Sequence, residues 1–170
     1  MKSVCFTGHR DVKITHELKN RLMHTLENLI NMGYTDFYAG GATGWDMLCE
    51  AAVLALRKKY TEIKLHLILP CVCSEQTKMW KDEQKLLHAL IRVFADSEEY
   101  AARHYYDGCM KLRNERLVFY ADCCVCYYNK KSPCGTGQTV RMAIEKGIEI
   151  FNLAQRADYS AKAAIRSTTS

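Results

Sequence analysis

The sequence predicts an α/β domain of Rossmann-like type, a three-layer sandwich with a mostly parallel central sheet. Two observations lead there. Short apolar strand segments alternate with segments of helical periodicity from the first residues onward, and glycine-bearing loops follow several of the strands. Such alternation favours parallel strands with helices on both faces. The length of 170 residues fits one domain, which we expect over 1–153, followed by a tail over 154–170.

The first half of the chain contains three predicted strands and two predicted helices. The strands are Ser3–Thr7, Asp36–Ala39 and Ile63–Leu69, the last ended by Pro70. Apolar residues at helical spacing predict one helix from about Ile14 to Met32, with Thr15 as its N-cap and Gly33 as its stop. A second helix is expected from about Asp46 to Tyr60.

The second half continues the alternation. A loop over Cys71–Gln76 is followed by a helix over Thr77–Leu90, a short strand over Ile91–Ala95 and a helix over Tyr106–Tyr120. The remaining elements are a strand over Cys123–Tyr128, a loop over Asn129–Thr136, a helix over Gly137–Lys146 and a last strand over Ile148–Leu153.

Composition excludes several classes of protein. No stretch approaches the ~20 apolar residues of a membrane span, and the N-terminus enters a strand pattern directly, without the apolar core of a signal peptide. The nine cysteines are odd in number and sit partly in apolar strands, which indicates reduced thiols and a cytoplasmic protein. Their spacing, as in Cys71-Val72-Cys73, does not match a zinc ribbon, so we expect no metal site.

The net charge of +5 is compatible with an anionic ligand. It includes no concentrated stripe of Lys and Arg, so a nucleic-acid partner is not expected. No membrane partner is expected either.

Three glycine-bearing loops follow predicted strands: Thr7–Arg10, Gly40–Asp46 and Pro133–Thr139. The carboxyl ends of parallel strands share one edge of a sheet, where ligands bind. Glycine lets the backbone approach a phosphate, and a helix N-terminus offers free N–H donors. None of the loops is a Walker A loop or a Gly-x-Gly-x-x-Gly fingerprint, which disfavours a standard NAD dehydrogenase. The alternative for each loop is a simple βα turn.

The candidate site residues come from these loops and from the helix before the last loop. The candidates for ligand or phosphate binding are Gly8, His9, Arg10, Gly40, Gly41, Ala42, Gly44, Asp46, Arg113, Asn114, Gly135, Thr136 and Thr139. Arg10 and Arg113 offer the charge and fork geometry that suit phosphate.

The catalytic candidates are Arg113, Glu50 and Asp46. Asp46 and Glu50 lie one helical turn apart, so both carboxylates could act on one ligand. The simpler interpretation of Asp46 is a helix-capping or dipole-complementing residue.

Together these motifs resemble the YspA/YpsA-like branch of the SLOG superfamily over about Met1 to Leu153. The matching pieces are Phe6-Thr7-Gly8-His9-Arg10, Gly40-Gly41-Ala42-Thr43-Gly44-Trp45-Asp46, the Pro70 strand end, Trp80, Arg113-Asn114 and Cys134-Gly135-Thr136. The resemblance implies a Rossmann-like fold and kinship with two groups: the LOG-type nucleoside-monophosphate phosphoribohydrolases and the DprA DNA-processing proteins. It is compatible with a homodimer.

In the LOG enzymes the pattern is an Arg on a helix, a strand, then Pro-Gly-Gly-x-Gly-Thr and a catalytic Glu. The resemblance carries Arg113 over, but the position of the Glu falls near Thr139, which has no carboxylate. Hydrolysis of an N-glycosidic bond would therefore need Asp46 or Glu50 to act on water.

We thus expect a protein that binds a nucleotide-derived small ligand, for sensing or processing, with no cofactor required. The alternatives are a phosphoribohydrolase-like hydrolase of an N-glycosidic or nucleotide-sugar bond and a DprA-like binder of single-stranded DNA.

Overall fold

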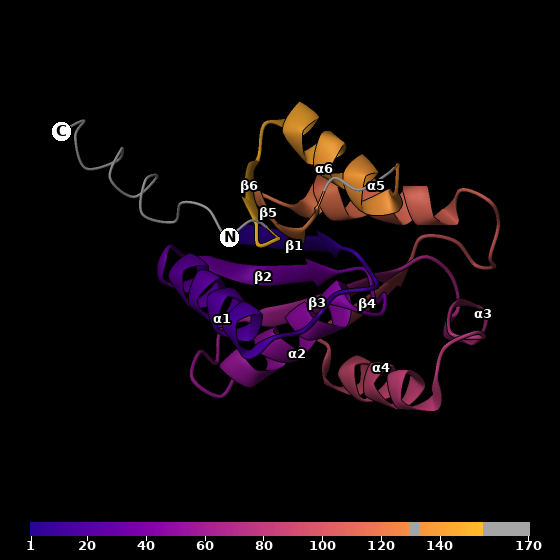
Figure 1. The fold of residues 1–170 in the computed structure, drawn as a ribbon, viewed down its shortest axis with the longest axis horizontal. Helices are drawn as coiled ribbons and strands as arrows, with labels where there is room; N and C mark the ends of the chain where they lie inside the picture. Colours follow the sequence, from indigo (N-terminus) through magenta and orange to yellow (C-terminus); the bar gives the residue numbers. More distant parts are fainter. Residues whose placement is uncertain (130–132, 155–170) are drawn as a thin grey trace.

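In a computed structural model, which describes residues 1–129 and 133–154, six strands form one sheet with the order β4-β3-β2-β1-β5-β6 (Figure 1). Every neighbouring pair of strands is parallel. The strands are β1 (Lys2–Gly8), β2 (Tyr34–Ala39), β3 (Lys64–Leu69), β4 (Ser97–Tyr100), β5 (Cys123–Tyr127) and β6 (Glu149–Asn152). The predicted Rossmann-like α/β class is confirmed.

Helices cover both faces of the sheet, as the alternating pattern requires. The helices are α1 (His16–Asn31), α2 (Trp45–Leu56), α3 (Cys73–Gln76), α4 (Asp82–Phe94), α5 (Cys109–Tyr120) and α6 (Gly135–Lys146). Figure 1 shows α1, α2 and α4 on one side and α5 and α6 on the other.

The strand β1 lies in the middle of the sheet and separates two hydrophobic cores. Val4 and Phe6 pack toward α1 and α2, while Cys5 packs toward α5 and α6 with residues such as Leu117 and Val140. Successive side chains of a strand point to opposite faces, so an unbroken apolar run supplies both cores. All nine cysteines are free thiols, and most are buried.

The helix boundaries follow the local capping chemistry. Thr15 is the N-cap of α1, as predicted, and its side chain accepts a hydrogen bond from Leu18 N at 3.1 Å. Gly33 follows the helix with φ +88°, a left-handed conformation that favours glycine.

The predictions between Pro70 and α5 need correction. The strand expected over Ile91–Ala95 is wrong, because α4 continues to Phe94 and turns Ile91 into the core. The strand in this region is β4, whose polar sequence Ser-Glu-Glu-Tyr has no apolar alternation because it forms an edge of the sheet.

The ends of several further elements also differ. The helix expected to run to Tyr60 ends at Leu56, and the helix expected from Gly137 begins at Gly135. The helix expected from Thr77 begins at Asp82, where the side chain of Gln84 accepts a hydrogen bond from Lys81 N at 3.0 Å. The loop expected over Cys71–Gln76 contains the short helix α3, and α5 begins at Cys109 rather than Tyr106.

The described residues include no helix that is long and apolar enough to cross a membrane. They also contain no group of three or more His, Cys, Asp or Glu side chains placed to hold a metal ion. Apart from Ala154, the tail expected over 154–170 lies outside the described residues.

Candidate functional site

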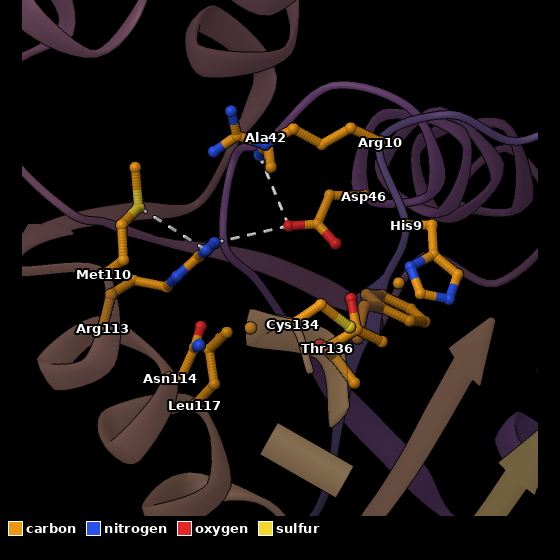
Figure 2. A pocket seen from close by; sticks show the side chains of 14 residues that line it. His9, Arg10, Ala42, Asp46, Met110, Arg113, Asn114, Leu117, Cys134 and Thr136 are labelled. Carbon is orange, nitrogen blue, oxygen red and sulfur yellow. Dashed lines mark hydrogen bonds and ion pairs between the residues drawn. The ribbon is translucent and has the colours of Figure 1, made fainter. Parts of the chain in front are cut away.

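A pocket of about 360 Å³ opens at the carboxyl end of β1 (Figure 2). Its wall comes from the end of β1 and the following loop, the loop before α2, one face of α5, and the start of α6. The lining residues are Phe6, Thr7, Gly8, His9, Arg10, Ala42, Asp46, Met110, Arg113, Asn114, Leu117, Cys134, Gly135 and Thr136.

The topology of the sheet explains why a hollow forms here. The chain passes from β1 to β2 on one side, whereas β5 pairs with β1 on the other side. The loops after β1 and β5 therefore diverge, which is the switch point where open parallel sheets bind ligands. The three glycine-bearing loops predicted to share one edge do meet at this pocket.

The structure brings most, but not all, of the candidate residues to the pocket wall. Those that line it are Gly8, His9, Arg10, Ala42, Asp46, Arg113, Asn114, Gly135 and Thr136. Those that lie outside the lining are Gly40, Gly41, Gly44, Glu50 and Thr139. Sequence reasoning missed Met110 and Leu117 as wall residues, although both share one helical face with Arg113 and Asn114.

The Gly40–Gly41 segment is held by side chains instead of lining the pocket. Arg113 Nη1 donates to Gly40 O at 2.9 Å, and Glu50 Oε1 accepts from Gly41 N at 3.1 Å. Gln76 Nε2 donates to Gly41 O at 2.8 Å. The carbonyl group of Gly40 therefore holds Arg113 at the pocket, while Glu50 and Gln76 hold the neighbouring Gly41 in place.

Arg113 and Asp46 form a buried ion pair in the pocket wall. Arg113 Nη1 lies 3.5 Å from Asp46 Oδ2, and the two side chains are only 10% and 5% exposed. Asp46 Oδ2 also accepts from Ala42 N at 3.3 Å. Burial raises the pKa of Asp46, and Arg113 opposes that rise. Asp46 is not the N-cap of α2, a position that Gly44 occupies.

Glu50 lies behind the loop, fully buried and away from the pocket lining. Burial raises its pKa well above the ordinary carboxyl value, and the neighbouring Asp46 raises it further. Its Oε2 has no hydrogen-bond partner among the described residues. The raised pKa favours the protonated form of Glu50. Its side chain accepts the hydrogen bond from Gly41 and is poorly placed to act on a ligand in the pocket.

Glu50→Gln should flatten the dependence of stability on pH. Because the pKa of Glu50 is raised above the unfolded value, the native state binds the proton more tightly. The free energy of unfolding then falls as pH rises from about 4.5 through the folded-state pKa. In urea unfolding at pH 5 and pH 8.5, the free energy of unfolding of the variant relative to that of the wild type should be more favourable at the higher pH. A difference that does not change with pH would contradict the assignment.

The N-terminus of α6 faces the pocket with unused donors. The first amides of a helix have no acceptor within it, and those of Gly135 and Thr136 have none elsewhere in the described chain. Cys134 is the N-cap, and its Sγ accepts from Gly137 N at 3.4 Å. The Thr139 hydroxyl instead donates to Gly135 O at 2.9 Å, within the helix.

Two further polar side chains of the wall are unpartnered within residues 1–129 and 133–154. Asn114 is only 4% exposed and makes no side-chain hydrogen bond there. Arg10 is exposed and forms no ion pair there, although it is close enough to Asp46 to lower the pKa of that carboxyl. Figure 2 shows Arg113 pointing toward Asp46, while the Arg10 side chain extends above Asp46 toward Ala42.

At the start of α2, by contrast, the first amide is engaged within the protein. Trp45 N donates to His9 O at 3.2 Å, and Gly44, with φ +78°, approaches so closely that a Cβ would lie 2.2 Å from Arg10 O. The two helix starts near the pocket therefore differ: the first amide of α2 is engaged, whereas the first two amides of α6, at Gly135 and Thr136, have no acceptor among the described residues. With two arginines and one carboxylate beside it, the pocket has an electrostatic balance that favours an anion.

The fold and site define a Rossmann-like α/β protein with an open pocket at the switch point of its sheet. The model of the YspA SLOG family matches residues 4–162, so the chain belongs to this family. Comparison with curated protein sequences gives no significant match.

Two solved structures share the fold. The DNA processing protein A of Helicobacter pylori, whose structure concerns its single-stranded DNA binding mode, is 19% identical with a TM-score of 0.61. The match covers 98% of this chain and 73% of that one. The structural genomics target TM1055 is 17% identical with a TM-score of 0.54, over 88% of this chain and 72% of that one. At these identities the likeness concerns the fold.

Proposed function

We propose that this protein binds a small phosphate-bearing, nucleotide-derived ligand in the pocket at the end of β1. The observation that supports this best is the N-terminus of α6, where Gly135 and Thr136 line a cavity together with Arg10. Neither their amides nor the Arg10 guanidinium has a partner among the described residues. Backbone amides at a helix start and a nearby guanidinium are the usual partners of a phosphate.

The remainder of the wall suits the rest of such a ligand. Phe6, Met110 and Leu117 give an apolar surface. Asn114 and Thr136 add polar side chains that make no hydrogen bond within the described part of the chain. A volume of about 360 Å³ lies near the lower end of the range for small-molecule sites. The pocket thus favours a mononucleotide-sized ligand over an extended polymer.

A thermal-shift panel tests the proposal. Purified protein is heated with AMP, NMN, NAD, ADP-ribose, cyclic nucleotides or a short oligonucleotide, and each mixture is analysed by chromatography for breakdown products. A ligand at ~100 times its dissociation constant stabilises the native state by ~2.7 kcal/mol. A shift with intact nucleotide supports binding, and a shift with breakdown supports the hydrolase alternative. A shift with the oligonucleotide alone supports DNA binding, and no shift contradicts the proposal.

Arg10→Ala should weaken ligand binding without changing stability. Arg10 is exposed and unpaired in the described chain, so its loss leaves no buried charge behind. Hydrogen bonds to charged groups contribute ~1.5–3 kcal/mol, which corresponds to roughly 10- to 100-fold in affinity. Calorimetric titration of both proteins with the nucleotide found in the panel measures this, with Lys19→Ala on exposed α1 as the control. Equal nucleotide affinities of the wild type and Arg10→Ala would show that Arg10 does not contact the ligand.

A further inference from the structure

A second cluster of reactive side chains lies on three adjacent strands, outside the pocket. His66 of β3 stands between Asp36 of β2 and Ser97 of β4. His66 Nδ1 lies 2.7 Å from Ser97 Oγ, and His66 Nε2 lies 2.9 Å from Asp36 Oδ1. None of the three lines the pocket at the end of β1.

The ionisation state of Asp36 determines which atoms carry the protons in the hydrogen bonds that join Asp36, His66 and Ser97. Hydrogen bonds from Thr35 and His66 lower the pKa of Asp36 against the opposing effect of burial. An ionised Asp36 only accepts hydrogen bonds, so His66 Nε2 must donate the proton between them. In the neutral imidazole Nδ1 then carries the lone pair, and the Ser97 hydroxyl donates to it. The three groups have the same roles of nucleophile, base and orienting acid as in serine hydrolases, with the two ring nitrogens of the base exchanged.

The surroundings hold the base in position. The Thr35 hydroxyl donates to Asp36 Oδ2 at 2.7 Å, so both carboxylate oxygens are engaged. The His66 ring stacks on Tyr38 with centroids 4.7 Å apart, and Tyr38 stacks on Tyr120 of α5 at 5.1 Å. The imidazole is therefore fixed from one face and from both nitrogens.

The nucleophile remains accessible to a solute. Ser97 is exposed and is the first residue of β4, an edge strand. Lys64, on the same strand and the same face as His66, is exposed and makes no ion pair with any described residue. A cation at this place can stabilise negative charge that develops during attack by Ser97.

We propose that Ser97 is an activated nucleophile that accepts acyl groups from reactive esters, with His66 as its base and Asp36 as the residue that orients the base. Ser97 Oγ attacks the ester carbonyl and passes its proton to His66. The bond from the carbonyl carbon to the leaving oxygen then breaks, and that oxygen receives the proton. Water activated by His66 releases the acid and restores Ser97.

The openness of the site sets the expected class of substrate. Ser97 is exposed on an edge strand and does not line the pocket at the end of β1, so we expect little binding energy from a large substrate. Small activated esters, whose leaving groups need little assistance, are the chemistry this cluster fits. General base assistance by His66 should contribute about 10²-fold or more to the rate.

Covalent labelling with a fluorophosphonate probe tests the proposal. In this reaction Ser97 Oγ forms a bond to phosphorus, fluoride leaves, and His66 takes the proton. Peptide mass spectrometry of the wild-type protein should locate the label at Ser97, and Ser97→Ala should remove it. His66→Gln and Asp36→Asn should each lower the labelling rate, the former by about 10²-fold. Ser74→Ala, at an exposed serine of α3, should label like the wild type.

Two results would overturn the proposal. One is a wild-type protein in which Ser97 is not labelled selectively, either because no label is found or because Ser74 is labelled as much as Ser97. The other is labelling of Ser97 that is unchanged in both His66→Gln and Asp36→Asn, with native folding checked by circular dichroism. Nucleotide binding at the pocket is measured separately by the thermal-shift panel, so failure here is separable from failure of the pocket to bind a nucleotide.

Discussion

Replacing Gly40 with alanine should lower the free energy of unfolding by ~1–3 kcal/mol, the usual cost of inserting a methyl group where a packed side chain must move aside. A Cβ at this position would lie 1.6 Å from Arg113 Nη1 and 2.9 Å from Asp46 Oδ2. The guanidinium must then shift, which weakens its contacts with Gly40 O and Asp46. Urea unfolding monitored by circular dichroism measures the loss.

Gly135→Ala is the matched control for this substitution. The nearest atom to a Cβ at Gly135 is Asn114 Nδ2 at 3.7 Å, an ordinary contact, and the position begins a helix. Its stability should therefore stay within about 1 kcal/mol of the wild type, since alanine is favoured over glycine in helices. If Gly40→Ala proved as stable as Gly135→Ala, the docking of Arg113 on Gly40 would be wrong.

Asp46→Asn should have the larger effect, a protein ~3–5 kcal/mol less stable, because Arg113 loses its counterion in a buried place. Arg113→Met should also destabilise, by leaving Asp46 unpaired. The double variant should lose less than the sum of the two single variants, because it removes both charges together. A double-mutant cycle from urea unfolding at pH 7.5 gives the coupling energy.

Asp82→Asn controls for the change from carboxylate to amide. The Asp82 side chain is fully exposed and lies 3.9 Å from Lys85, so its loss should change stability by less than ~0.5 kcal/mol. A coupling energy near zero for Asp46 and Arg113 would show that each contributes through contacts other than the pair.

Much of the fold followed from local chemistry in the sequence. Apolar runs such as Ile63–Leu69 predicted buried parallel strands, and Thr15 marked a helix start correctly. The failures have a common cause in tertiary structure. An edge strand needs few apolar residues, so the sequence of β4 has no apolar pattern that predicts a strand. Ile91 belongs to α4 instead, where its side chain is buried against the core.

The location of the site could be predicted from the sequence, but not which of its residues face the pocket and which contact other side chains. Loop composition showed where the three strand ends meet, because glycine-bearing loops at parallel strand ends share one edge. Whether a glycine faces a ligand or a side chain depends on residues far along the chain. Gly40 contacts Arg113, which is 73 positions away, and Glu50 turns inward to Gly41.

The most direct test of the proposed function is a titration of isotope-labelled protein with AMP and ADP-ribose, followed by amide resonances in solution. If the N-terminus of α6 binds the phosphate, the amide signals of Gly135 and Thr136 should move most, and the movement should be reduced in Arg10→Ala. Nucleotide binding that shifts resonances elsewhere, with Gly135 and Thr136 unchanged, would contradict the assignment of this pocket.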